Sequence, residues 1–242
     1  MVLDWLSLHQ PDVLALQETK MTDAEFPAEA IRNMGYQVCY SGQKTYNGVA
    51  MMARQELTDI VTGFAGFEDA QKRLLAATVA GYRLINVYIP NGSEVGSGKY
   101  AYKLDWLEHL KPHVHSELKT HETVVLMGDF NIAPEDRDVY DPVAWRDKLL
   151  CTPAERAVFA ELLQLGMVDA FRLFEQPENS YSWWDYRMQA FRRKMGLRID
   201  HILVSQTATL ACQRCYIDIE PRRLERPSDH APVVLELASS QV

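Results

Sequence analysis

Apolar runs that end in polar side chains are the main pattern along this chain. The segment Val124-Val125-Leu126-Met127 is typical of a strand covered on both faces, and it ends at Gly128-Asp129-Phe130-Asn131. The segment 12–18 repeats this design and ends in a carboxylate. Because side chains alternate along an extended chain, Asp129 and Asn131 should point to one side, where they could bind a phosphate or a hydrated metal ion. An Asx turn that closes a strand would use the same two residues.

The same pattern predicts an irregular succession of helices and strands. Helices are expected over 2–8, 24–34, 99–119 and 153–165. Further strands are expected over 36–40, 48–53, 73–80, 82–89, 180–184, 198–204, 215–220 and 232–237. Pro112 should kink or divide the third helix, and Thr152-Pro153 with Glu155 should open the fourth. Such irregular alternation favours a layered α/β or α+β sandwich over a barrel of strict βα units.

The composition is that of one ordinary globular domain. The 242 residues are 47% apolar and 24% charged, so a substantial core and a single domain over 1–242 are expected. No apolar run approaches the roughly 20 residues of a membrane span, and the start lacks a signal-peptide pattern. We therefore expect a cytoplasmic protein without a membrane partner, and we also expect a monomer. Cys212 and Cys215 have CxxC spacing but no second ligand pair, which argues against zinc.

Charge neither demands nor excludes a nucleic-acid partner. The net charge of −8 is unusual for a protein that meets phosphate backbones, but it is an average over the whole surface. Local basic clusters are present at Arg187, Arg192, Arg193, Lys194 and Arg198, and at Arg222, Arg223 and Arg226. Such clusters permit nucleic-acid binding, although solvated faces have the same composition.

Polar residues at the ends of several predicted strands could meet at one rim of the fold. They are Glu18, Tyr88, Asn91, Asp129, Asn131, Asp200, Asp229 and His230. Their convergence would give an oxygen-rich site with one imidazole, which suits Mg²⁺, with Mn²⁺ as a substitute, better than zinc. Phosphodiester hydrolysis is the matching chemistry, because the metal neutralises developing charge while a carboxylate or histidine activates water.

Six motifs in order along the chain resemble exodeoxyribonuclease III. They are Leu16-Gln17-Glu18-Thr19-Lys20, Asn47-Gly48-Val49-Ala50, Gly128-Asp129-Phe130-Asn131, Ser182-Trp183-Trp184-Asp185-Tyr186-Arg187, Leu197-Arg198-Ile199-Asp200-His201 and Ser228-Asp229-His230-Ala231-Pro232. This family belongs with DNase I to the endonuclease/exonuclease/phosphatase superfamily. The resemblance implies a DNase I-like, four-layer α/β sandwich in which helices flank two packed mixed β-sheets.

The resemblance also implies a Mg²⁺-dependent DNA repair nuclease. Its substrate would be double-stranded DNA, cleaved at 3′ ends as a 3′–5′ exonuclease or on the 5′ side of abasic sites as a class II endonuclease. The implied catalytic residues are Tyr88, Asp129, Asn131, Asp200 and His230. The implied metal-site residues are Glu18, Asp129, Asn131, Asp229 and His230. The implied DNA contacts are Asn91, Lys103, Trp183 and Arg187.

The implied roles divide the catalytic work. Asp129 would orient or deprotonate the attacking water, and Asn131 would hold the phosphate. His230 would stabilise the charge of the scissile phosphate, with Asp200 fixing its tautomer and orientation. Tyr88 would donate to the phosphate or to the leaving oxygen. Glu18 would be the main Mg²⁺ ligand.

Ordinary structural roles compete with several of these functions. Tyr88 could be a core tyrosine, Lys103 could be a surface charge, and one of Trp183 and Trp184 should be buried. The histidines that are expected to be structural are His109, His113, His115, His121 and His201.

Two other functions stay open. One is a phosphatase or phosphodiesterase of the same superfamily that acts on a non-DNA phosphate. The other is a non-catalytic DNA-binding remnant, because the family's first strand, of roughly ten residues, has no counterpart ahead of the helix at 2–8. An open sheet edge is expected in its place.

Overall fold

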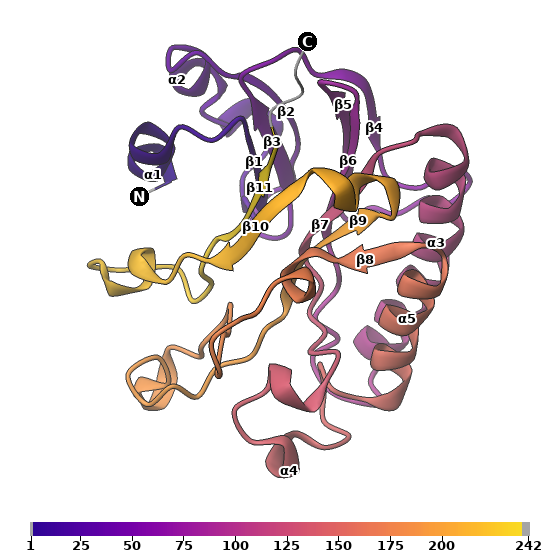
Figure 1. Cartoon of the computed structure of the whole chain (residues 1–242), viewed down its shortest axis with the longest axis vertical. Helices are drawn as coiled ribbons and strands as arrows, with labels where there is room; N and C mark the ends of the chain where they lie inside the picture. The colour runs from indigo at the N-terminus through magenta and orange to yellow at the C-terminus, as the bar shows by residue number, and fades with distance from the viewer. Residues whose placement is uncertain (1, 239–242) are drawn as a thin grey trace.

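In the computed structural model, which describes residues 2–238, two inner layers of β-sheet lie between two outer layers of helices (Figure 1). The outer layers hold the longer helices. On one side these are α1 (Val2–His9) and α2 (Ala28–Arg32), and on the other α3 (Gly98–Thr120) and α5 (Pro153–Gln164). Short helical segments lie in the connections: α4 (Pro142–Trp145), Asp23–Glu25, Asp136–Asp138, Ala170–Leu173, Arg187–Gln189, Thr207–Ala211 and Glu220–Arg223. The predicted four-layer α/β sandwich is confirmed.

One of the two inner layers is a six-stranded mixed sheet. Its strands, in spatial order, are β4 (Thr58–Thr62), β5 (Leu74–Val79), β6 (Tyr82–Tyr88), β7 (Val124–Asp129), β9 (Asp200–Ser205) and β8 (Met167–Asp169). Strands β6 and β7 are parallel, and α3 forms the crossover between them that a parallel pair requires. The other neighbouring pairs in this sheet are antiparallel.

The other inner layer consists of two separate sheets. Strands β1 (Val13–Gln17), β3 (Val49–Ala53) and β2 (Gln37–Ser41) form one, and β10 (Cys212–Ile217) and β11 (Val233–Leu237) form the other. All of their pairings are antiparallel. The expectation of two mixed sheets is therefore right for the six-stranded sheet and wrong for this layer. Strand β1 lies at an edge of its sheet, and all five of its residues are partly exposed.

Strand β7 contributes to two hydrophobic cores because its side chains alternate. Val124 and Leu126 pack with α3 and α5, whereas Val125 faces the core between the two inner layers. A third cluster joins α1 and α2 to the β1–β3–β2 sheet through Leu6, Ile31 and Met52. The apolar run that precedes Gly128 is thus buried on both faces.

One buried amide connects the two inner layers. Asn86 of β6 is completely buried, and its Nδ2 donates to the carbonyl oxygens of Leu16 (2.9 Å) and Ala50 (3.0 Å). Its Oδ1 accepts from the side chain of Gln17 at 2.7 Å. Because each polar atom has a partner, Asn86 fixes β1 relative to β6 without an unsatisfied group.

Three local features differ from what the sequence pattern predicted. Helix α3 is not divided at Pro112, because Leu107, Leu110 and Val114 on either side hold it against the core. The segment 180–184 forms only isolated bridges from Trp183 to Leu197 and His230. Strands β4 and β8 were not predicted, since β4 is exposed along its whole length and β8 has only three residues.

Among the described residues, no helix is long and apolar enough to cross a membrane.

Candidate active site

Three acidic or phenolic residues occupy neighbouring positions on adjacent strands at one end of the six-stranded sheet, which we call the rim. Tyr88, the last residue of β6, is in register with Asp129, the last residue of β7. Asp129 is in turn paired with Asp200, the first residue of β9. The parallel β6–β7 pair brings two strand ends together, and the antiparallel β9 adds its beginning to the same rim.

His230 completes a compact cluster at this rim. Its Nδ1 lies 2.9 Å from Oδ2 of Asp200, and its Nε2 lies 4.0 Å from Oδ2 of Asp129. One donor atom from each of Asp129, Asp200 and His230 lies within 4.8 Å of the others. Backbone bonds from Trp184 N to Asp229 O and from Ala231 N to Ser182 O hold the histidine's segment in place.

The protonation of this cluster follows from burial and from opposite charges. Burial raises the pKa of Asp129 to about 7, with His230 opposing that rise and Asp200 adding to it. Burial alone would lower the pKa of His230, but the carboxylates of Asp200, Asp129 and Asp229 together outweigh it, Asp200 contributing most, and raise the pKa to about 10. His230 is then an imidazolium at neutral pH, and Asp129 lies close to its own titration midpoint. An imidazolium has no free lone pair, so the charged His230 fits the predicted phosphate contact better than the predicted metal contact.

Asn131 is bound tightly to the groups around it. Its backbone N–H donates to Oδ1 of Asp129 at 2.9 Å, and its Nδ2 donates to Oδ2 of Asp129 and to the carbonyl of Ile89. Its Oδ1 accepts from Nδ2 of Asn91 at 2.8 Å. Both amide protons are therefore used within the protein, so the side chain of Asn131 orients Asp129 rather than offering a free donor to a phosphate.

Glycine at position 128 is required by the backbone. Gly128 has φ +138°, and a Cβ built on it would lie 2.0 Å from the carbonyl oxygen of Val87 on the neighbouring strand. This close approach brings β7 against β6 immediately before Asp129.

Tyr88 is held by Arg73, which the sequence did not single out. The Arg73 guanidinium donates to the carbonyl oxygen of Tyr88 at 2.9 Å and lies over the Tyr88 ring at 4.7 Å. Burial raises the pKa of Tyr88, and the carboxylates of Asp129 and Glu18 raise it further. The phenol stays protonated and can act as a hydrogen-bond donor. An arginine ahead of a strand has no sequence signal that separates it from a surface charge.

Glu18 reaches the rim from the other inner layer. It follows β1 with φ +56°, its carboxylate lies close enough to the Tyr88 hydroxyl to raise the pKa of that phenol, and it lies 3.1 Å from the ammonium of Lys20. The preceding residue, Gln17, is the one bonded to Asn86. The predicted metal ligand therefore sits at the same rim as Tyr88 and Asp129, although it is outside the three-residue cluster.

Asp229 and Trp183 are bonded to each other. The indole Nε1 of Trp183 donates to Oδ2 of Asp229 at 3.0 Å. Asp229 lies outside the three-residue cluster. Trp183 is half-buried, whereas Trp184 is buried. This arrangement supports the 228–230 segment and leaves part of the Trp183 ring accessible.

Of the four predicted DNA contacts, Lys103 is wrong as a direct contact. Its side chain is 0% exposed and pairs with Glu155, so it cannot reach a phosphate at the surface. Arg187 is the opposite case, with a side chain that is 86% exposed and paired with Asp185. Asn91 is exposed at the rim and bonded to Asn131. His201 is buried, and its Nε2 contacts the carbonyl of Ile132, consistent with a structural role.

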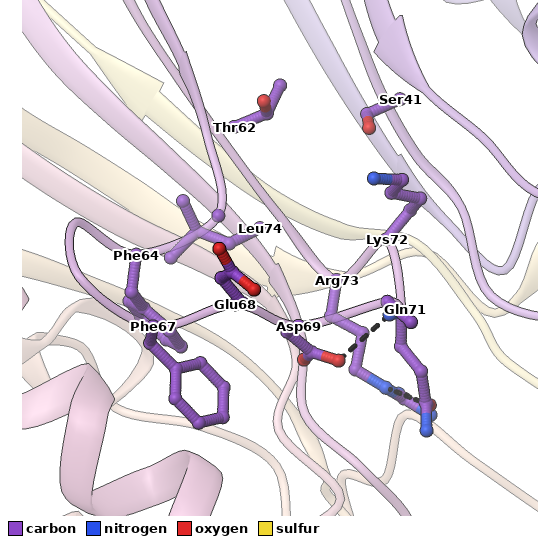
Figure 2. A pocket seen from close by; sticks show the side chains of 12 residues that line it. Ser41, Thr62, Phe64, Phe67, Glu68, Asp69, Gln71, Lys72, Arg73 and Leu74 are labelled. Carbon is purple, nitrogen blue, oxygen red and sulfur yellow. Dashed lines mark hydrogen bonds between the residues drawn. The ribbon is translucent and has the colours of Figure 1, made fainter.

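A surface pocket of about 470 Å³ lies beside this rim rather than at it. Figure 2 shows its lining residues, among them Phe67, Asp69, Gln71 and Arg73. Gln71 accepts from Nε of Arg73 at 2.9 Å and donates from its backbone to Asp69. None of the predicted catalytic side chains lines the pocket, and Arg73 is its link to Tyr88.

The donor set at the rim fits a hard divalent cation. Carboxylate oxygens of Glu18, Asp129 and Asp200 dominate it, and the four free cysteines, including Cys212 and Cys215, are not among the cluster residues. Oxygen-rich sites of this kind suit Mg²⁺ or Mn²⁺. Glu18 has the most accessible carboxylate of the three, with a side chain that is 39% exposed.

Comparisons with known proteins identify the family. A model of the endonuclease/exonuclease/phosphatase family matches residues 1–230. The chain is 39% identical to exodeoxyribonuclease III from Haemophilus influenzae, in an alignment 241 positions long that covers 94% of this chain and 90% of that protein.

Two solved structures agree with this assignment. The 3′ phosphatase NExo from Neisseria, bound to a product DNA hairpin, has a TM-score of 0.96 and 46% identity, covering 98% of this chain and 92% of that one. An AP endonuclease from Archaeoglobus fulgidus has a TM-score of 0.93 and 37% identity, covering 98% of this chain and 93% of that one. The resemblance to exodeoxyribonuclease III is thus confirmed, and the chain belongs to the endonuclease/exonuclease/phosphatase family.

Proposed function

We propose that this protein is a Mg²⁺-dependent DNA repair nuclease that hydrolyses phosphate esters at the 3′ ends of double-stranded DNA. Its relatives support the class of reaction, since they include an exodeoxyribonuclease III and a DNA 3′ phosphatase that align over most of the chain. Incision on the 5′ side of abasic sites is the second activity we propose. The similarity to an AP endonuclease supports it.

The observation that carries the proposal is the cluster of Asp129, Asp200 and His230 at one sheet rim. Asp129, with a pKa of about 7, can accept the proton of an attacking water at neutral pH. The His230 imidazolium, held by Asp200, can neutralise the phosphate oxygens as negative charge develops. The protonated Tyr88 can donate a hydrogen bond to the phosphate.

A divalent cation would add to this charge neutralisation. Glu18, with Asp129 beside it, would hold the ion, and the ion would lower the pKa of bound water and polarise the phosphate. Asn131 keeps the Asp129 carboxylate oriented through two hydrogen bonds. Asn91, Trp183 and the exposed Arg187 would contact the DNA around the reacting nucleotide.

The test is turnover on defined substrates with Mg²⁺ and with EDTA. The substrates are duplexes with a 3′-phosphate, a recessed 3′-hydroxyl end or an abasic site, and an inositol phosphate as the non-DNA substrate. We expect Mg²⁺-dependent release of phosphate or nucleotides from the DNA and no turnover of the inositol phosphate. Full activity in EDTA, or a preference for the inositol phosphate, would overturn the proposal.

Two variants separate an enzyme from a DNA-binding remnant. Asp129→Asn keeps the shape of the side chain but removes the base, and should lower kcat by about 10³-fold while DNA binding persists. Asp105→Asn changes an exposed carboxylate on α3 and should leave kcat unchanged. A wild-type protein that binds DNA but turns over no substrate would be the remnant.

A further inference from the structure

We propose that the buried ion pair of Lys103 and Glu155 positions the active-site loops by holding the backbone of Asn91 and Asn131. This inference rests on the proposed function, because it assigns the pair a part in turnover. The pair lies beneath the catalytic rim and touches no position at which a substrate could sit, since both side chains are 0% exposed.

The ammonium group of Lys103 has three acceptors for its three protons. Nζ lies 2.5 Å from Oε1 of Glu155, 2.7 Å from the carbonyl oxygen of Asn131 and 3.3 Å from that of Asn91. The two carbonyls belong to loops that are 40 residues apart in sequence and follow β6 and β7. A single cation therefore ties both loops to α3, the helix that carries Lys103.

Asn131 connects Lys103 directly to the carboxylate of Asp129. Asn131 uses its backbone N–H and its Nδ2 to hold both oxygens of Asp129, and its Oδ1 to hold Asn91. Asn131 also has φ +50°, a left-handed conformation that a side-chain-bearing residue adopts at some cost. The bond from Lys103 to the Asn131 carbonyl stabilises that conformation and so fixes the direction of the Asp129 carboxylate.

Glu155 anchors the pair to a rigid element. It is the third residue of α5, and its Oε2 accepts from the backbone N–H and the hydroxyl of Thr152 in a capping box. Its Oε1 accepts from the backbone N–H of Leu150, and the Leu150 carbonyl in turn accepts from Ala133 N at 2.7 Å. Glu155 at the N-terminus of α5 thus holds the 131–133 loop by two routes. One runs through Lys103 to the carbonyl of Asn131, and the other through Leu150 to the backbone N–H of Ala133.

A second buried ion pair offers a matched comparison. Arg83 and Glu117 form a bidentate pair between β6 and α3, as Lys103 and Glu155 do between α3 and α5. Arg83 lies at the other end of β6, five residues and about 16 Å from Tyr88. Its remaining bond goes to the carbonyl of Asp59 rather than to a catalytic loop. Loss of this pair should affect stability without affecting the rim.

The experiment compares neutral replacements of the two pairs. Breaking one member of a buried pair leaves an uncompensated charge, whereas removing both charges is often nearly neutral for stability. K103M and E155Q should each lower Tm, and the double variant K103M/E155Q should regain much of that loss. The pair R83M/E117Q is the control for a buried pair lost elsewhere in the same layer.

Turnover of the 3′-phosphate duplex then distinguishes positioning from stability. We expect K103M/E155Q to have a kcat lowered about tenfold to 100-fold with KM within about threefold of wild type, because Asp129 and Asn131 are misaligned. R83M/E117Q should keep the wild-type kcat at a temperature where it is folded. A wild-type kcat in K103M/E155Q would overturn the inference.

A second readout does not depend on activity. Amide hydrogen exchange over 129–133 should be faster in K103M/E155Q than in wild type and unchanged in R83M/E117Q. If the double variant does not fold, E155Q alone is measured, and wild-type kcat together with wild-type exchange would overturn the inference. A wild type without turnover would refute the proposed function, and the exchange comparison would still decide whether the pair orders the loop.

Discussion

Asp200 and His230 are joined by a hydrogen bond of 2.9 Å between Oδ2 and Nδ1, although they lie 30 residues apart on different segments. The bond directs the Nε2 edge of His230 toward Asp129, 4.0 Å away. The Asp200 carboxylate also contributes most among the negative charges that keep the half-buried imidazole protonated. Both the orientation and the charge of His230 thus depend on Asp200.

Removal of that carboxylate should change the pH dependence of turnover. Asp200 contributes most among the carboxylates that raise the pKa of His230 to about 10 against the effect of burial. In Asp200→Asn the imidazole should lose its proton at lower pH. The alkaline limb of the kcat profile should therefore move to lower pH, and kcat should fall by about 10²-fold. Asp218→Asn, which affects the Trp5 and His9 contacts of α1, is the control. An unchanged alkaline limb in Asp200→Asn would contradict this assignment.

The acid limb of the pH profile of kcat/KM should follow the protonation of Asp129. Its raised pKa, about 7, means that the folded protein keeps the carboxyl protonated below that pH, so the base form is lost as pH falls. We expect kcat/KM, measured from pH 5 to 9, to rise through about pH 7. A bound cation favours the carboxylate, so higher Mg²⁺ should move the limb to lower pH. A profile that is flat from pH 5 to 7 would exclude Asp129 as the base.

Gly128→Ala should damage the site through the backbone. The new Cβ would meet the Val87 carbonyl at 2.0 Å, so β7 must shift next to Asp129. We expect a loss of about 1–3 kcal/mol in unfolding free energy and a lower kcat. Gly81→Ala is the matched control, because Gly81 also has positive φ but has open space around it. It should cost about 1 kcal/mol and leave kcat unchanged. Equal kcat values in the two variants would contradict the role of Gly128.

Asn86→Leu should uncouple the predicted metal ligand from the rest of the site. The change leaves the Leu16 and Ala50 carbonyls without their partner, which should cost about 2–4 kcal/mol in unfolding free energy. Because Glu18 follows Gln17 on β1, more Mg²⁺ should be needed for half-maximal turnover. Thr78→Val is the control, since the hydroxyl of Thr78 is buried without a hydrogen-bond partner. Unchanged Mg²⁺ dependence in Asn86→Leu would show that β1 is placed by packing alone.

The sequence predicted those parts of the site that depend on local pattern. Tyr88 and Asp129 close their strands and Asp200 opens one, and an apolar run bounded by a polar residue can be recognised without knowing the neighbours. Their convergence also followed, because the strands that carry them pair in one sheet. The capping box at Thr152 and Glu155 is a local pattern of the same kind.

What the sequence could not predict depends on contacts between distant segments. Lys103 looks like a solvated helix charge until Glu155, 52 residues later, packs against it. The segment 180–184 alternates like a strand, yet the Ser182 hydroxyl accepts from the backbone of Ile199 and Asp200 and takes the place of a ladder. Strand β4 could not be predicted from an apolar run, because its residues are exposed to solvent.

The division of the site between two inner layers has a consequence for how activity is lost. Glu18 directly follows β1 of the β1–β3–β2 sheet, whereas Tyr88, Asp129 and Asp200 belong to the six-stranded sheet, and Asn86 joins the two. A loosened form in which each sheet keeps its own ladder but the layers slip past each other would retain its circular dichroism in the far ultraviolet. It would nevertheless have no activity. Turnover therefore reports whether the two inner layers are correctly packed against each other, which measures of secondary structure do not detect.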